Sequence, residues 1–206
     1  YSITDFNNLT IAMWDGTEWT EVPSTVTGTA ASGSITTNST VSDFSNRYFA
    51  LGYKVSVPNT YVPDDNFEAY LETHDASGYP VSVGDANSMG DGIANNDSVF
   101  TISISGVTNI DVSGLNIADL TGIEDFTAIN SLNCGNNQIT SLNLSNNTAL
   151  TSFYCGNNQL TRLDIRNGNN ANLSYFNSSG NPNLYCIYVD DANVYYANWA
   201  RDSHTG

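Results

Sequence analysis

The stretch that decides the fold is residues 129–165, INSLNCGNNQITSLNLSNNTALTSFYCGNNQLTRLDI. Apolar, cysteine and asparagine positions recur within it at a spacing of 21 residues. Another copy begins at Val107, and a further one begins at Leu173 after a small insertion around 167–170. A fixed period of this length is typical of a solenoid, in which each copy forms one coil that stacks on the next. The matched positions are Ile110, Leu132, Phe153 and Phe176, then Val112, Cys134, Cys155 and Ser178, then Leu115, Asn137, Asn158 and Asn181.

The four copies share the pattern L-xx-L-x-L/C-xx-N-x-L, which identifies a leucine-rich repeat solenoid. Each copy is expected to contribute one short strand whose alternate residues, such as Leu132 and Cys134, point into the core. The asparagines at the turn, Asn137, Asn158 and Asn181, are predicted to be structural. Buried in the bends, their amides would bond backbone groups of their own and neighbouring coils.

Two cysteines, Cys134 and Cys155, occupy equivalent inward positions on adjacent strands. Neighbouring strands are close enough for a disulfide by Cα distance. Side chains stacked in register usually point in parallel, and a buried cysteine behaves as a small hydrophobe. We therefore expect free thiols at these two positions, with Cys186 apart from them in a C-terminal cap.

Residues 62–71 have a different period from the repeats. Val62 and Pro63 are followed by acidic residues, which suit a helix N-terminus. Phe67, Tyr70 and Leu71 then form one apolar stripe at helical spacing. The sequence predicts a short cap helix here.

Residues 1–53 read as strands. Two alternating runs, 9–14 and 17–22, flank Asp15-Gly16, which is a strong hairpin signal, and 44–51 predicts another strand. So few strands cannot bury both faces of a sheet, so we expect the C-terminal portion of a β-sandwich. The predicted architecture is mainly β with a short cap helix: sandwich strands at 1–53, a linker at 54–61, and a leucine-rich repeat domain with an N-terminal cap helix and a C-terminal cap at 62–206.

The charge of the chain excludes some partners. It has 206 residues, 21 of them acidic and 5 basic, and a net charge of −16. One lysine and four arginines cannot make the basic patch that binds phosphates, so nucleic acid is excluded. Membrane insertion is not expected either, because no apolar run approaches the length of a bilayer span. The polar surface comes instead from neutral groups, including 29 asparagines.

Residues 62–200 resemble leucine-rich repeat proteins secreted by Bacteroidota such as flavobacteria. The similarity is carried by the helix 62–71, the loop 89–97, the segment 115–126, the Cys-Gly-Asn-Asn-Gln copies and the tail from Leu184 to Trp199. It implies an extracellular or cell-surface location and export by the type IX secretion system, guided by a C-terminal sorting domain. No such domain follows the repeats and the chain begins at Tyr1, so we expect a processed product or a segment of a longer protein.

The loop 85–96 resembles an EF-hand calcium loop in part. Asp85, Asn87 and Asp91 match three ligand positions, and Gly90 matches the invariant glycine. Met89 offers no oxygen, however, and Asn96 replaces the bidentate glutamate. Two interpretations stay open, a calcium site at Asp85, Asn87 and Asp91, and an Asn/Asp-rich turn that closes the cap helix onto the first coil. We favour the turn.

No catalytic constellation is evident. The two histidines, His74 and His204, come with no nucleophile motif, and a serine or cysteine nucleophile needs an oriented base. There is no C-x-x-C and no His/Cys cluster for zinc. We expect no enzyme activity and no cofactor.

The strand residues that alternate with the inward ones should form a neutral, amide-rich outer face. Asn133, Tyr154, Tyr175 and Asn177 are the candidate binding residues, since tyrosine and asparagine make contacts at low entropic cost. We expect a non-catalytic protein- or glycan-interaction module, an adhesion module, of a secreted bacterial cell-surface protein. Two alternatives remain, a structural spacer and an accessory region of a secreted hydrolase whose catalytic domain lies outside this chain.

Overall fold

The chain divides into two units, Tyr1–Ser56 and Val57–Gly206. The structure, a computed structural model, describes residues 58–193 and 199–202 in full, and in the first unit the backbone of the strands alone. Those strands are β1 (Leu9–Trp14), β2 (Trp19–Val22), β3 (Ser24–Thr29), β4 (Ser32–Thr37) and β5 (Tyr48–Tyr53).

In the first unit, β1 pairs with β2 antiparallel, with Trp14 opposite Trp19, as the hairpin signal predicts. The turn at Asp15-Gly16 lies outside the described residues. β5 pairs with the other edge of β1, while β3 and β4 form a separate two-stranded sheet. The strand predicted at 44–51 is described only from Tyr48, and it continues to Tyr53. A β-sandwich stays a prediction.

The second unit starts earlier than expected, with β6 (Asn59–Tyr61). β6 pairs antiparallel with β7 (Ser98–Phe100). The Thr60 side chain is buried, and its hydroxyl donates to Asp125 Oδ2 at 2.6 Å. The predicted linker 54–61 therefore overlaps the first strand of the solenoid unit, because a buried threonine holds that strand against the first coil.

The cap helix α1 spans Asp65–Thr73, so it begins three residues later than predicted. Asp64 is its N-cap, with Oδ1 accepting from the backbone N–H groups of Asn66 and Phe67. The other oxygen of Asp64 accepts from the N–H groups of Ala118 and Asp119 in the first coil. One carboxylate thus both starts the helix and fastens it to the solenoid.

Two glutamates of α1, Glu68 and Glu72, are fully buried, although the sequence pattern assigned only apolar side chains to the inner face. Their carboxylates accept backbone N–H groups of the loop that follows the helix. Glu72 binds those of Asp91 and Gly92, and Glu68 binds those of Asn96 and Asp97. Burial raises the pKa of Glu72, against the lowering effect of these N–H groups. The two glutamates therefore hold the loop 91–97 against the helix.

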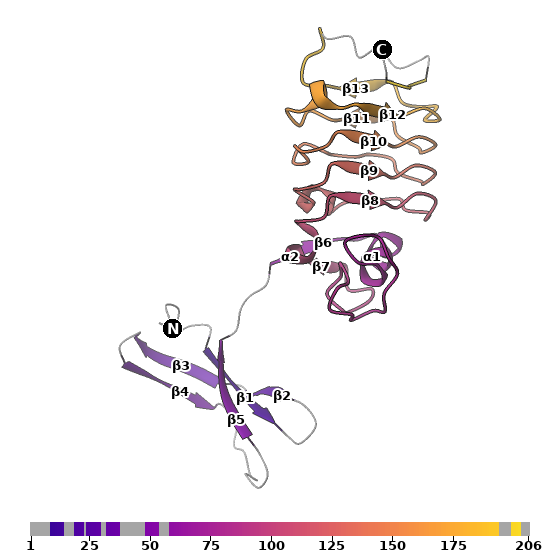
Figure 1. Cartoon of the computed structure of the whole chain (residues 1–206). Helices are drawn as coiled ribbons and strands as arrows, with labels where there is room; N and C mark the ends of the chain where they lie inside the picture. Colours follow the sequence, from indigo (N-terminus) through magenta and orange to yellow (C-terminus); the bar gives the residue numbers. More distant parts are fainter. Residues whose placement is uncertain are drawn as a thin grey trace. The chain divides into compact units, whose positions relative to one another are not determined.

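The solenoid is built on a parallel sheet of four short strands, β8 (Asn109–Asp111), β9 (Ser131–Asn133), β10 (Ser152–Tyr154) and β12 (Tyr175–Asn177). They stack in the order β12-β10-β9-β8 with Leu132 opposite Phe153 and Phe153 opposite Phe176 (Figure 1). These inner side chains are buried, and α1 and α2 (Thr101–Ile104) lie at the β8 end. The leucine-rich repeat solenoid is confirmed.

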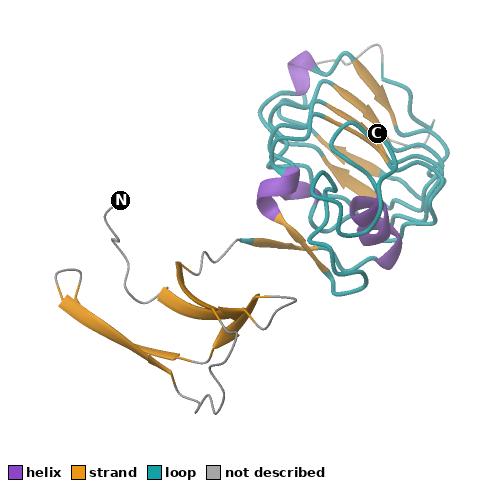
Figure 2. Ribbon diagram, turned by 60° about the horizontal axis from the view of Figure 1, so that its bottom comes forward, coloured by secondary structure: helices purple, strands orange, loops and turns teal. Residues whose placement is uncertain are grey.

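The return run of each coil forms a second surface. β11 (Arg162–Asp164) pairs in parallel with β13 (Cys186–Tyr188), and Asn143 bridges to Asp164. Short 3-10 turns at Ile123–Asp125 and Asn170–Asn172 complete the coils, which are mostly loop (Figure 2). Within the described residues, no helix has the length and apolar character to cross a bilayer.

The asparagine ladder is present as predicted. Asn137 accepts from the N–H groups of Leu115 and Ile117 in the preceding coil and donates to Val112 O and Cys134 O. One and two coils further on, Asn158 and Asn181 each accept from one N–H group, that of Ile139 or Leu160, and each donates to two backbone carbonyls in the same way. Each buried amide therefore joins two coils through backbone groups that no strand pairs.

A second pair of buried asparagines, Asn147 and Asn170, lies on the other bend and was not among the predicted structural asparagines. Asn147 Nδ2 donates to Ile123 O and Phe126 O, and Asn170 Oδ1 accepts from the N–H of Asp190. Each lies three residues before an inward leucine, Leu150 or Leu173. This shared spacing in the sequence could have predicted that both asparagines are buried.

Cys134 and Cys155 are buried free thiols, as predicted. Burial raises the pKa of Cys134 to about 12 and raises that of Cys155 well above its usual value. Both side chains therefore act as packing groups and not as nucleophiles.

Candidate binding site

The outward side chains of the four-stranded sheet form two rows. In the strand register, Ser131 lies between Asn109 and Ser152, and Tyr175 ends the first row. The second row runs from Asp111 through Asn133 and Tyr154 to Asn177. The alternation in the sequence predicts one outer face for these strand residues, and the structure places them there.

A hollow of about 750 Å³ lies over this face, between the sheet and the end of the cap helix. Its floor includes the small side chains of Ser131 and Ser152. Tyr154 and Tyr175 line it at one end, and Tyr175 is 50% exposed. Of the four predicted binding residues, Asn133, Tyr154 and Tyr175 line the hollow and Asn177 does not.

The other wall comes from the cap, through Tyr70, His74, Ser77 and Gly78. The rings of Tyr70 and His74 stack at 4.2 Å with 15° between their planes. Burial raises the pKa of Tyr70, and the nearby charges of Asp111 and Asp75 raise it further. Tyr70 belongs to the apolar stripe predicted for the helix, and none of these wall residues was among the predicted binding residues.

The two asparagines among the predicted binding residues, Asn133 and Asn177, form hydrogen bonds within the protein. Asn133 Oδ1 accepts from the N–H of Gly135 at 3.2 Å, and Asn177 Oδ1 accepts from the N–H of Ser179 at 2.9 Å. Asn133 Nδ2 also donates to Asp111 Oδ2 at 3.1 Å. These amides close the turn after each strand, so the tyrosines are the side chains better placed to contact a partner.

Tyr154 is held in place by two glycines of the repeat. A Cβ atom on Gly135 would lie 2.0 Å from Tyr154 Cε1, and one on Gly156 would lie 3.0 Å from Tyr154 Cζ. The ring therefore lies flat over the backbone of both turns. In the next copy, where Asn177 replaces the tyrosine, Ser179 stands in the glycine's place.

We expect Gly135→Ala to displace the Tyr154 ring and to lower the free energy of unfolding by about 1–3 kcal/mol through overpacking. Urea denaturation and the aromatic NMR signals of Tyr154 measure the two effects. The control is Gly106→Ala, since a Cβ atom there meets nothing within 4 Å. In a Tyr154→Ala background most of the cost of Gly135→Ala should disappear, leaving only the approach of the Cβ atom to Gly156 O at 3.2 Å, and an unchanged cost would contradict the contact with Tyr154.

The expected calcium ligands are engaged in local turns. Asp85 Oδ1 accepts from the N–H and the side-chain amide of Asn87, and Asp91 Oδ1 accepts from the N–H of Ile93. Among the described residues, a different set of acidic side chains is close enough to share a cation. It consists of Asp65, Glu68 and Asp97, whose carboxylate oxygens lie within 4.8 Å of one another. The bonds of Glu68 to the N–H groups of Asn96 and Asp97 account for its position without a cation.

The chemistry of the hollow is that of hydroxyl groups, amides and phenol rings. His74 Nδ1 lies 3.0 Å from Tyr70 O and 3.1 Å from Thr73 Oγ1, so that nitrogen is engaged within the cap. Asp111 Oδ1 accepts from the N–H of Ser113. These groups suit non-covalent recognition.

No protein-family model and no curated protein matches the sequence. Two solved structures from Listeria monocytogenes share part of the fold. The first is the functional domain of InlJ, described as including a cysteine ladder, with 24% identity over 64% of this chain and 33% of that one, at a TM-score of 0.41. The second is an internalin, InlF, with 26% identity over 62% of this chain and 36% of that one, at a TM-score of 0.44. The chain thus spans about a third of the length of these structures.

Proposed function

We propose that this chain is a non-catalytic recognition module of a secreted bacterial cell-surface protein, and that it binds its partner in the hollow over the four-stranded sheet. The observation that carries the proposal is the lining of that hollow. Tyrosines from two strands and a stacked Tyr70–His74 pair enclose a floor of serines. The secreted location and the export route rest on the resemblance to Bacteroidota proteins.

Rigid aromatic side chains favour a binding role over a spacer role. Tyr154 lies against glycine backbone, so little conformational entropy is lost when a partner contacts its ring. Its hydroxyl makes no hydrogen bond among the described residues and is available to a partner. A spacer would not need an ordered tyrosine whose ring requires glycine at two neighbouring positions, Gly135 and Gly156.

The lining also indicates the kind of partner. Among the described residues that line the hollow, Asp111 carries the one carboxylate, and none is a lysine or an arginine. With a net charge of −16, the chain repels polyanions. A neutral, polar segment of a protein or a neutral glycan is the expected ligand.

The double variant Tyr154→Ala/Tyr175→Ala is expected to weaken partner binding by about tenfold or more, because tyrosines that a partner covers are typical energetic centres of interfaces. Binding of the full chain is measured on a glycan array and on a panel of immobilised extracellular proteins. The matched control is Tyr61→Ala/Tyr185→Ala, which removes two tyrosines that are 60% and 63% exposed elsewhere. Equal binding by both double variants would favour the spacer.

A further inference from the structure

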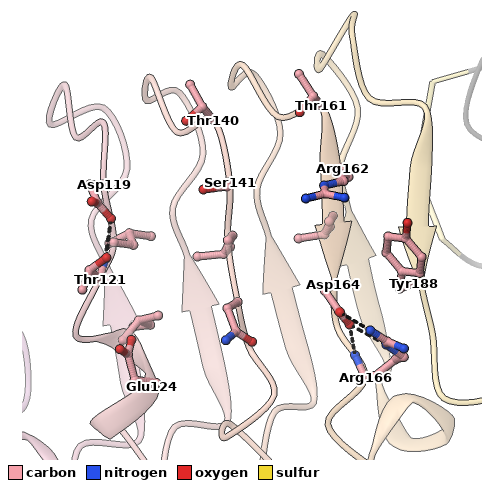
Figure 3. A pocket seen from close by; sticks show the side chains of 15 residues that line it. Asp119, Thr121, Glu124, Thr140, Ser141, Thr161, Arg162, Asp164, Arg166 and Tyr188 are labelled. Carbon is pink, nitrogen blue, oxygen red and sulfur yellow. Dashed lines mark hydrogen bonds and ion pairs between the residues drawn. The ribbon is translucent and has the colours of Figure 1, made fainter.

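A second hollow, of about 810 Å³, lies over the return runs of the coils (Figure 3). It is separate from the hollow over the four-stranded sheet. Within one coil, Leu132 and Cys134 of the strand and Leu142 and Leu144 of the return run all point into the same core. The outward side chains of the two runs therefore face different sides of the solenoid.

Two basic side chains are part of the lining of this second hollow. The chain has five lysines and arginines, and two of them, Arg162 and Arg166, line it. Arg166 is already engaged, since its Nε donates to Asp164 Oδ1 at 2.9 Å and its guanidinium lies 5.1 Å from the centre of the Tyr188 ring. This pair lowers the pKa of Asp164.

Arg162 differs from Arg166. Its side chain is exposed, and it makes no hydrogen bond or ion pair within the part of the chain that the structure describes. It projects from the first residue of β11, with Ser141 of the preceding coil on one side. On the other side is β13, where Cys186 lies opposite Arg162 and Tyr188 is two residues further along (Figure 3). A guanidinium offers a planar fork of donors that matches a carboxylate. A guanidinium group that has no carboxylate partner among the described residues is suited to an anionic group of a ligand.

The surrounding groups limit the ligand to one negative charge among neutral polar groups. Thr140, Ser141, Asn143 and Thr161 contribute hydroxyl and amide groups to the lining. At the rim, Asp119 and Glu124 would repel a row of carboxylates, phosphates or sulfates but accept hydrogen bonds from sugar hydroxyls. Tyr188 is 39% exposed and adds aromatic surface.

We propose that this second hollow binds a saccharide that carries a single carboxylate, as in a hexuronic acid residue, with Arg162 holding the carboxylate. The hydroxyl and amide groups of the lining, together with Asp119 and Glu124, contact the neutral part of the sugar. The proposal concerns a different surface from the tyrosine-lined hollow, so it does not depend on the function proposed above.

The test is an NMR titration of the full chain that follows the arginine Nε–H signals. The probes are a neutral oligosaccharide ending in one glucuronic acid residue and the same oligosaccharide ending in glucose. The acidic probe is expected to bind with a dissociation constant in the millimolar range or below and to shift the Arg162 signal. The glucose-ended probe should bind about tenfold more weakly or worse, because it lacks the charged hydrogen bonds.

Matched variants assign the effect to one side chain. Arg162→Gln should weaken binding of the acidic probe about tenfold, while Arg201→Gln, which removes an equal charge from an exposed site, should not change it. Tyr154→Ala/Tyr175→Ala should also leave it unchanged. Equal binding of the two probes, no shift at millimolar concentration, full binding by Arg162→Gln, or tighter binding of an acidic peptide would each overturn the proposal.

Discussion

Replacing Asn158 with Ala is expected to lower the free energy of unfolding of the solenoid by about 3 kcal/mol or more. The Asn158 side chain is 5% exposed, accepts from the N–H of Ile139 and donates to the carbonyls of Cys134 and Cys155, each at 3.0 Å. Alanine leaves these buried groups without a partner, and each unpaired group costs about 1–3 kcal/mol. Urea denaturation measures the loss, and faster hydrogen exchange at the Ile139 amide places it in the ladder.

Two further variants separate the ladder from a general effect of losing an asparagine. Asn146 is exposed, and its side chain makes no hydrogen bond in the described part of the chain, so Asn146→Ala should change stability by no more than about 0.5 kcal/mol. Asn158→Asp keeps an acceptor for Ile139 but buries a charge that cannot donate, so it should destabilise strongly at neutral pH. Part of that loss should return in acid, because a protonated carboxyl group donates again. Equal stability of Asn158→Ala and Asn146→Ala would show that the ladder contributes nothing.

Replacing Phe153 with Ala is expected to cost about 3–5 kcal/mol, the range for truncating a buried aromatic side chain. Phe153 is fully buried, and its ring centre lies 5.7 Å from that of Phe176. Phe176 in turn lies 4.5 Å from Trp199, which covers the C-terminal end of the core. Truncation would open a cavity between Leu132 and Phe176, at one end of this row of three aromatic rings. Loss of hydrogen-exchange protection in β10 and β12, together with urea denaturation, measures the effect.

The repeat itself supplies the control for Phe153. Leu132 occupies the same position in the preceding coil and lies opposite Phe153 in the sheet. Phe153→Leu should therefore cost less than about 1.5 kcal/mol, since the site accepts a side chain of similar volume. If leucine were as destabilising as alanine, the loss would come from the aromatic contact and not from the cavity.

The repeated part of the fold could be predicted because the same environment recurs in every coil. An inward position such as Leu132 or Phe153 packs against the equivalent positions of the adjacent coils. Its apolar character therefore repeats at the coil spacing. The same holds for Asn137, Asn158 and Asn181, whose amides meet equivalent backbone groups. The outward face followed from the alternation of a strand.

The non-repeating parts could not be predicted from the same signal. Glu68 and Glu72 read as solvent-exposed positions of a helix, yet both are buried against the loop 91–97. Their partners are backbone N–H groups, which leave no trace in the side-chain pattern. The start of the solenoid unit at β6 was missed for a related reason, because Thr60 contacts Asp125 across 65 positions.

The candidate site shows the same division. The sequence placed Tyr154 and Tyr175 on the outer face, but the hollow there exists only because the cap helix brings Tyr70 and His74 to that face. In the same way, Arg162 and Tyr188 line one hollow because β11 pairs with β13, which places Tyr188 opposite Asp164. The sequence by itself determined the period, the inward residues and the face of each strand, since these depend on spacing within one coil. The tertiary structure alone decided which side chains share a hollow and which cation is left unpaired, since these depend on contacts between segments with no common period.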